Sequence, residues 1–264
     1  MLFILCFLMG HIQDVAPLPA AHAHNDYAHP HPLFDALSQG FCSVEADIFL
    51  TEGSQLLVGH SKSELKPERT LVNLYLQPLR ERIRKNHGQV YSLPAGVKVP
   101  VFYLLIDIKT ESADTYPVLH KLLTEYADIL TEVRDGKVIE RAVTVVLSGS
   151  RPSLATLGRQ SPRFAGYDGR LSDLGSDVPA HLMPWVSDNW ALKISWNGNG
   201  VMPEKERDKL NAYIKQAHEQ NRKIRFWGAP DKEPVWQVQW DSKVDLINTD
   251  RLADLKLFLL SHMK

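Results

Sequence analysis

The chain has 264 residues, of which 30 are Lys or Arg, 31 are Asp or Glu and 44% are apolar. A chain of this length buries a full hydrophobic core without disulfides, and single (β/α)-barrels commonly run to about 250 residues. The formal net charge of −1 excludes a nucleic-acid binder held by bulk positive charge, and the composition excludes collagen, coiled coils and multi-span membrane proteins.

The first ten residues, MLFILCFLMG, are apolar and uncharged. They are too few to span a bilayer but fit the apolar core of a secretory signal, although no Lys or Arg precedes them. We therefore predict a signal peptide over residues 1–12 and a domain over residues 13–264, in a secreted or periplasmic protein. The alternative is a buried N-terminal strand in a cytoplasmic protein. Removal of the leader would take away Cys6 and leave Cys42 without a partner for an internal disulfide.

Short β-rich runs alternate with longer helical patterns along the rest of the chain. The strand candidates are residues 20–25, 42–50, 101–109, 142–148, 164–167, 191–196, 223–227 and 245–248. Apolar periodicity predicts helices most clearly at residues 32–39, 71–86, 116–130, 203–220 and 252–262. The pattern is weakest over residues 149–184. Eight strands alternating with helices predict an α/β fold, a single (β/α)8 TIM barrel.

Polar residues gather at the carboxyl end of the first predicted strand, which reads His22-Ala-His24-Asn25. In the second strand, alternation puts Glu45 and Asp47 on one face and apolar residues on the other. The apolar face would meet the helices, so both carboxylates would point into the barrel mouth, where active sites of this fold lie. Carboxylates forced together there repel each other unless a cation lies between them, which predicts a metal site.

The third strand repeats this arrangement, with Asp107 and Lys109 on the face opposite its apolar side chains. His60 follows a short apolar run and lies thirteen residues after Asp47. Taken singly, a histidine is more often a surface residue, and an Asp–Lys pair can be a plain ion pair. Their co-occurrence at the ends of the first three strands indicates a functional site.

These residues carry a resemblance to a known family. His24-Asn25, Glu45-x-Asp47, His60 and Asp107-x-Lys109 together resemble the phospholipase C-like phosphodiesterase superfamily. That superfamily includes glycerophosphodiester phosphodiesterases, phosphatidylinositol-specific phospholipases C and spider-type sphingomyelinase D. Further stretches resemble the branch that contains the fungal altered inheritance of mitochondria protein 6, namely HAHNDY (22–27), PLFDAL (32–37), VEAD (44–47), VGH (58–60), RFWGAPD (225–231) and INTD (247–250). The resemblance runs from about residue 19 to residue 260.

The resemblance implies a phosphoric diester hydrolase of the phospholipase C or glycerophosphodiesterase type, which cleaves a P–O bond of a glycerophosphodiester or phospholipid head group. It implies one divalent cation, Ca²⁺ or Mg²⁺, held by Glu45 and Asp47 with Asn25 and Asp107 as further ligands. The partners implied are a small-molecule or lipid phosphodiester and no nucleic acid. We expect a monomer that makes transient contact with a membrane surface.

The same resemblance implies that His24 and His60 are the catalytic acid–base pair and that Lys109 lies near the phosphate. His22 is a rival for the first catalytic position, because Ala21-His22 mimics the Ala-His of the glycerophosphodiesterase pattern. The His-Asn pairing favours His24, and His22 would then orient its neighbour. The His-Arg-Gly and Pro-Glu-Asn-Thr segments of the glycerophosphodiesterases are absent, which weakens glycerophosphodiesters as the substrate.

Two other functions fit the same barrel. One is a non-catalytic carbohydrate or lipid-head-group binding protein with a stacking surface built from six tryptophans, Trp185, Trp190, Trp196, Trp227, Trp236 and Trp240. The other is a metal-dependent amidohydrolase that uses His22-x-His24, but His120 and His181 are poorly placed as its further ligands. Bound zinc would favour the amidohydrolase, and calcium or magnesium the phosphodiesterase.

Overall fold

The computed structural model describes residues 15–94 and 96–263. The predicted signal peptide lies outside these residues and stays a prediction. Within the described part of the chain, no helix combines the length and apolar character needed to cross a membrane.

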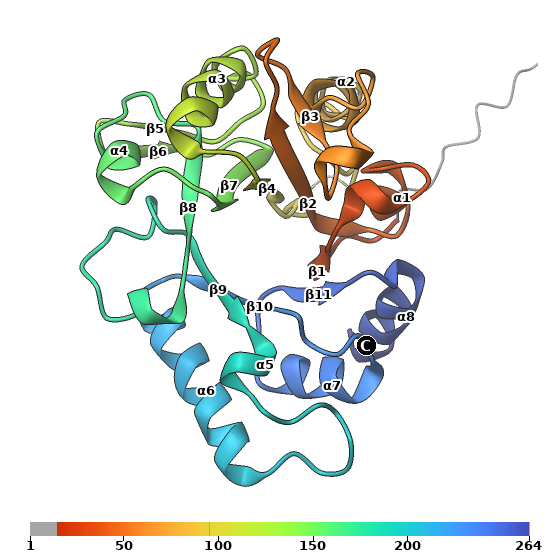
Figure 1. The fold of residues 1–264 in the computed structure, drawn as a ribbon. Coiled ribbons are helices and arrows are strands. Elements are labelled where there is room, and N and C mark those ends of the chain that lie inside the picture. Colours follow the sequence, from red (N-terminus) through yellow and green to blue (C-terminus); the bar gives the residue numbers. More distant parts are fainter. Residues whose placement is uncertain (1–14, 95, 264) are drawn as a thin grey trace, which may run out of the picture.

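Eight parallel strands form a nearly closed barrel, which confirms the predicted fold class (Figure 1). They are β1 (Leu18–Ala23), β2 (Phe41–Leu50), β4 (Phe102–Ile108), β7 (Val143–Gly149), β8 (Ala165–Gly169), β9 (Trp185–Asn189), β10 (Lys223–Trp227) and β11 (Ile247–Thr249). The strands pair in this order and β1 pairs with β11, while β10 and β11 meet through a single bridge between Arg225 and Leu246.

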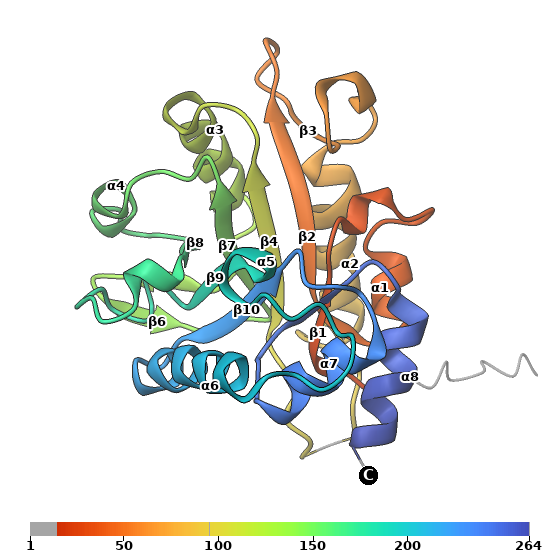
Figure 2. The same ribbon diagram turned by 60° about the horizontal axis from the view of Figure 1, so that its bottom comes forward.

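Helices follow the strands and cover the outside of the barrel (Figures 1 and 2). They are α1 (Phe34–Ser38), α2 (Gln77–Lys85), α3 (Ser112–Thr124), α4 (Leu154–Gly158), α5 (Trp190–Lys193), α6 (Glu204–Glu219), α7 (Glu233–Asp241) and α8 (Leu252–His262). A π-helical turn (Val72–Leu76) leads into α2, and 3-10 turns lie at Asp26–Ala28, Lys62–Glu64 and Leu171–Asp173. Strand β3 (Leu56–Val58) pairs antiparallel with β2, and β5 (Glu132–Arg134) and β6 (Lys137–Ile139) form a hairpin.

The prediction of a strand over residues 191–196 is wrong. The sixth barrel strand is β9, which ends at Asn189, and residues 190–193 form α5. The side chain of Asn189 accepts a hydrogen bond from the backbone N–H of Leu192 and so caps this helix. Trp190 is buried among apolar residues outside the barrel, edge-on to Phe226. The apolar run therefore packs as a helical turn.

The two faces of each barrel strand have different neighbours. On β2, Val44, Ala46 and Ile48 are fully buried in the cluster between the sheet and the helices. Inside the barrel, a smaller apolar cluster forms a floor, made of Leu105, Val146, Trp185 and Leu246. The inward side chains beyond this floor are polar. Strands β2 and β4 run parallel and end on the same side of the barrel (Figure 2). Their last inward side chains therefore lie at the carboxyl end of the barrel.

Candidate active site

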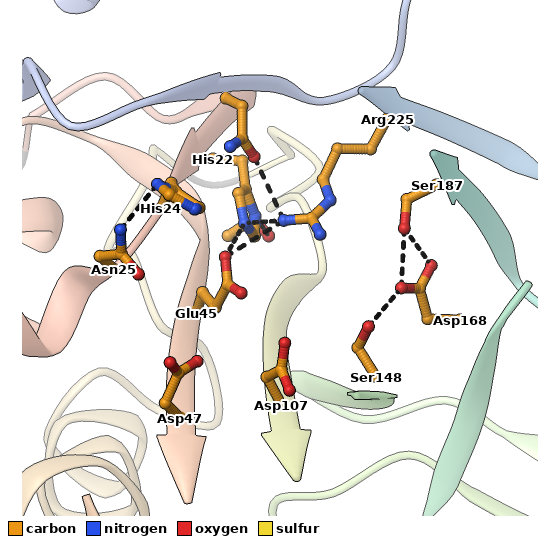
Figure 3. Close-up of polar contacts among 12 residues, drawn as sticks. His22, His24, Asn25, Glu45, Asp47, Asp107, Ser148, Asp168, Ser187 and Arg225 are labelled. Carbon is orange, nitrogen blue, oxygen red and sulfur yellow. Dashed lines mark hydrogen bonds and ion pairs between the residues drawn. The ribbon is translucent and has the colours of Figure 1, made fainter. Parts of the chain in front are cut away.

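Three carboxylates from two adjacent strands form the centre of the candidate site (Figure 3). Glu45 and Asp47 come from β2 and Asp107 from β4, and the parallel register pairs Asp47 with Asp107. One oxygen of each carboxylate lies within 4.8 Å of the others. Asp47 is 1% exposed and Glu45 5%. The three residues predicted as acidic metal ligands are therefore brought together.

The cluster has unused acceptors that suit a hard cation. Asp47 Oδ1 and Asp107 Oδ1 are both buried and have no hydrogen-bond partner. Gly149 makes room for the second of these carboxylates, because a Cβ there would lie 2.5 Å from the carbonyl oxygen of Ile108 and closer still to Asp107 Oδ1. Buried carboxylate oxygens without donors are costly, and carboxylates are the ligands that Ca²⁺ and Mg²⁺ prefer. The donor set fits such an ion.

The pKa shifts of the three carboxylates differ in direction, upward for Asp47 and Asp107 and downward for Glu45. Burial raises the pKa of Asp107 to about 6, and Glu45 and Asp47 add to this shift while Lys109 opposes it. Burial and the charge of Glu45 likewise raise the pKa of Asp47. Burial alone would also raise the pKa of Glu45, but Arg225 and His22 outweigh it and the net shift is downward. The charges of Asp47 and Asp107 are thus offset less than that of Glu45.

Lys109 lies on these two aspartates. Its Nζ is 3.0 Å from Asp47 Oδ2 and 3.3 Å from Asp107 Oδ2. Burial lowers the pKa of Lys109, but the two carboxylates outweigh burial and the net shift is upward. Because the lysine takes one oxygen of each aspartate, it leaves the other oxygen of each for a further ligand.

His24 is held by a carboxylate that directly follows the last strand of the barrel. Its Nδ1 is 2.8 Å from Asp250 Oδ1. Burial lowers the pKa of His24, but Asp250 and Glu45 outweigh burial and raise it overall. The Asn25 amide nitrogen lies 3.0 Å from the same Nδ1, but a ring nitrogen that donates to a carboxylate cannot also accept. Nδ1 therefore carries hydrogen toward Asp250, and Nε2 is left for the cavity.

Tyr27 connects three of the predicted site residues. Its hydroxyl lies 2.7 Å from Asp47 Oδ2, 2.7 Å from Asn25 Oδ1 and 3.2 Å from His60 Nδ1. Burial raises the pKa of Tyr27, so the phenol stays protonated. Its O–H donates a hydrogen bond to the carboxylate of Asp47. Asn25 has a left-handed backbone, with φ 47°, and lies in the turn that brings Tyr27 back to the site. Its predicted role as a metal ligand stays a prediction.

His60 reaches the site from the antiparallel strand β3. The backbone N–H of Gly59 donates to the carbonyl of Asp47, which places the following residue beside the acidic cluster. His60 Nδ1 is 3.5 Å from Asp47 Oδ2, and the side chain is 67% exposed. The two predicted catalytic histidines thus differ, with His24 half-buried and fixed and His60 open to solvent.

His22 lies deeper in the barrel than His24. The ring is completely buried, with Nδ1 2.7 Å from Ser43 Oγ and Nε2 2.7 Å from Arg225 Nη1. Burial, with help from Arg225, lowers its pKa to about 4. Because Arg225 can only donate, Nε2 accepts and Nδ1 donates to Ser43, so both ring nitrogens of His22 are engaged. Such a ring has no free lone pair for zinc, which removes support from the amidohydrolase.

Arg225 joins β10 to the acidic cluster. Its Nη1 also lies 3.3 Å from Glu45 Oε2 and 3.2 Å from Asn248 Oδ1 (Figure 3). The sequence alone predicts no role for Arg225, Tyr27 or Asp250. The stretches HAHNDY, RFWGAPD and INTD contain them, but nothing in those letters shows which residues they contact.

The acidic cluster and both predicted catalytic histidines line one cavity of about 310 Å³. Its walls are His24, Asn25, Glu45, Asp47, His60, Asp107, Lys109, Ser148, Gly149, Arg170, Arg225 and Trp227. His22 is not part of this lining. A second hollow of about 680 Å³ shares Asn25 and His60 with it and extends toward Lys66 and Arg69. The cavity therefore adjoins a larger hollow on the side of His60.

The barrel places the chain in a fold class that solved structures share. Two glycerophosphodiester phosphodiesterases from Parabacteroides distasonis each have a TM-score of 0.53 to this chain, at 13% and 16% sequence identity. They cover 96% and 94% of this chain, and 100% and 88% of their own. At this identity the likeness shows the fold, which is the barrel of glycerophosphodiester phosphodiesterases.

Sequence comparison narrows the class to a family. Residues 10–168 match the AIM6-like phosphodiesterase domain. Altered inheritance of mitochondria protein 6 of Eremothecium gossypii is 31% identical over 93% of this chain and 71% of the relative. The protein of that name from Saccharomyces cerevisiae strain ATCC 204508 / S288c is 32% identical over 91% of this chain and 70% of its own length. The chain belongs to the AIM6-like phosphodiesterase family.

Proposed function

We propose that this protein is a divalent-metal-dependent phosphodiesterase that cleaves a P–O bond by acid–base catalysis with two histidines. The observation that carries the proposal is the pair of buried, partnerless oxygens on Asp47 and Asp107, in a cavity that His24 and His60 also line. The family and the barrel fold support the same reaction class.

The charges of the site suit a phosphodiester. Glu45, Asp47 and Asp107 carry three negative charges when ionised, and Lys109 and Arg225 lie against them with two positive charges. The balance is one negative charge. A bound Ca²⁺ or Mg²⁺ would turn it into one positive charge, which matches the single negative charge of a phosphodiester. A bound cation supplies the positive charge that offsets the charge growing on the phosphoryl oxygens.

The two histidines would move the protons. His24, with Nδ1 held by Asp250, presents Nε2 as the base that removes a proton from the attacking hydroxyl. His60 would then donate a proton to the leaving alkoxide, and its exposed ring suits exchange with water. If the attacking hydroxyl belongs to water the product is a phosphomonoester, and if it belongs to the substrate the product is a cyclic phosphate. His22, which is neutral and engaged on both sides, would hold Arg225 and Glu45 in place.

The alternative of a non-catalytic binding protein has less support. Four of the six tryptophans are buried core residues, namely Trp185, Trp190, Trp196 and Trp236. Trp227 lines the cavity, and Trp240 packs against the outer core. The tryptophans therefore do not form a shared stacking surface in the described part of the chain.

The proposal is tested by hydrolysis of bis(p-nitrophenyl) phosphate after chelation and after addition of Ca²⁺ or Mg²⁺. Activity should vanish with chelator and return with one of these ions. Asp47→Asn and Asp107→Asn should each lower kcat/KM at least about a hundredfold, since removing a group that stabilises transition-state charge costs on that order. Asp208→Asn, on the exposed face of α6, is the matched control and should leave activity unchanged. Unaltered activity in chelator would refute the metal role.

Natural substrates can be ranked in the same assay format. Glycerophosphodiesters, phosphatidylinositol, lysophospholipids and sphingomyelin differ in the alcohol on each side of the phosphorus. The larger hollow beside His60 favours a substrate with a bulky substituent on that side. Comparable rates on all four substrates would contradict this expectation.

A further inference from the structure

We propose that Arg170 binds a phosphoryl oxygen of the substrate, and that Asp168, Ser148 and Ser187 form the buried support that holds its guanidinium at the cavity wall. The inference rests on the proposed function, because it identifies the residue that anchors the anion within that site. It concerns strands β7, β8 and β9, which the mechanism above does not use.

The support is a fully buried carboxylate. Asp168, on β8, has no exposed surface. It accepts hydrogen bonds from Ser148 on β7 at 2.6 Å and from Ser187 on β9 at 2.6 and 2.7 Å (Figure 3). Arg170 Nη1 donates to the same carboxylate at 2.9 Å. A buried charge is tolerated only when it is paired and its lone pairs are satisfied. Here Arg170 pairs with the charge, and serines from the two neighbouring strands satisfy the lone pairs.

The geometry fixes one end of Arg170 and leaves the other for a ligand. Nη1 also donates to the backbone carbonyls of Asp168 and Gly169, at 3.2 and 3.0 Å. Across the described residues, every hydrogen bond of the Arg170 side chain leaves from Nη1. The N–H groups of Nε and Nη2 therefore remain available to a ligand. The side chain is 27% exposed and lies on the wall of the cavity. Two N–H groups in a planar fork match two oxygens of a phosphoryl group.

Lys109 and Arg225, the other lysine and arginine of the cavity wall, contact the carboxylates of the acidic cluster, whereas Arg170 is paired with Asp168 outside it. Lys109 bridges Asp47 and Asp107, and Arg225 Nη1 contacts Glu45 and His22. Asp168 offsets the charge of Arg170, so this residue adds directed donors instead of net charge. Arg170 can therefore hold an anion in one orientation. Asp168 does not compete with the acidic cluster for a metal ion, because its oxygens are occupied by Ser148, Ser187 and Arg170.

The first test measures binding of inorganic phosphate to the Ca²⁺- or Mg²⁺-loaded protein by isothermal titration calorimetry. Arg170→Gln should weaken phosphate binding by about 10- to 100-fold, because it removes charge-assisted hydrogen bonds to the anion. Arg170→Lys should restore only part of the affinity, since an ammonium cannot bind two oxygens in parallel. Arg159→Gln, an exposed arginine at the end of α4, is the matched control and should bind as the wild type does.

The second test separates the positioning role of Asp168 from a general structural role. Asp168→Asn should weaken phosphate binding while Arg170 is present, and the double variant Asp168→Asn/Arg170→Gln should bind no worse than Arg170→Gln alone. Additive losses would contradict a role exerted through Arg170. The double variant removes both charges of the buried pair, so it also replaces Arg170→Gln should the single variant fail to fold.

The outcomes keep this inference apart from the proposed function. If the protein hydrolyses phosphodiesters and Arg170→Gln retains its phosphate affinity and its KM, the role of Arg170 is wrong and the proposed function stands. If phosphate binding depends on Arg170 while no phosphodiester is hydrolysed, the anion site stands and the proposed activity fails. If the wild type binds no phosphate, the inference is overturned.

Discussion

Gly149 ends strand β7 beside the acidic cluster, and its replacement by alanine perturbs that cluster without removing any charge. The residue has φ +67°, a region that L-residues avoid at a cost of roughly 1–2 kcal/mol. The added Cβ would lie 2.5 Å from the carbonyl oxygen of Ile108 and closer to Asp107 Oδ1, so backbone or carboxylate must move. Overpacking of this kind costs about 1–3 kcal/mol. We expect Gly149→Ala to lose about 2–5 kcal/mol of stability.

The matched control is Gly200→Ala. Gly200 has φ +64°, and a Cβ there would have nothing within 4 Å, so this variant should lose the backbone contribution alone. The assay is thermal unfolding of both variants with and without Ca²⁺ or Mg²⁺. At roughly 2–4 °C per kcal/mol, Gly149→Ala should lower Tm by about 4–20 °C, and Gly200→Ala by about 2–8 °C.

The metal-dependent part of the assay tests the site itself. Displacement of Asp107 should shrink the rise in Tm that the cation produces in the wild type, whereas Gly200→Ala should keep that rise in full. If Gly149→Ala is no less stable than Gly200→Ala, the close approach of Asp107 to this glycine is wrong. If the cation stabilises both variants equally, Asp107 is not a ligand.

Three further predictions concern the histidines and the acidic groups. His24→Ala and His60→Ala should each lower kcat at least about a hundredfold in steady-state assays at saturating metal, whereas His22→Ala should act mainly through stability and metal retention. Asp250→Asn should remove an interaction that raises the pKa of His24, so the limb of the pH–rate profile that reports His24 should move to lower pH; an unmoved limb would argue against this pairing. In metal-free protein, the folded-state pKa of Asp107 is about 6 against an ordinary 3.8. Its contribution to stability is therefore present below about pH 4 and lost as the pH rises through 6. Asp107→Asn should flatten that part of a urea-unfolding profile, and a profile parallel to that of the wild type would contradict the raised pKa.

The fold was predictable because most barrel strands have a clear local pattern. Residues 42–50 and 101–109 alternate between apolar and polar side chains, and the structure places strands there as β2 and β4. The error at residues 191–196 has a physical cause, since a short apolar run has no period long enough to separate a strand from a helical turn. In the structure a helical turn forms there, with Asn189 at the end of β9 as its cap.

In the candidate site too, some residues could be predicted from local sequence patterns and others could not. Glu45, Asp47 and Asp107 could be placed together because two adjacent strands and one alternation rule determine where they point. Arg225 could not, because its partners His22 and Glu45 lie on β1 and β2, and their meeting with β10 depends on how the barrel closes. His22 and Arg225 are 203 positions apart, and nothing in the sequence signals their 2.7 Å contact.

The distribution of charge within the site explains why the three carboxylates are not equivalent. Glu45 has its own cation and an imidazole against it, so burial does not prevent its ionisation. Asp47 and Asp107 share a single lysine, and each keeps one buried oxygen without a donor. An additional positive charge is therefore most stabilising between these two aspartates, at the edge where β2 and β4 end. A cation bound there would lie next to His60 and Tyr27, so the least satisfied part of the site adjoins the solvent-exposed histidine proposed as the proton donor.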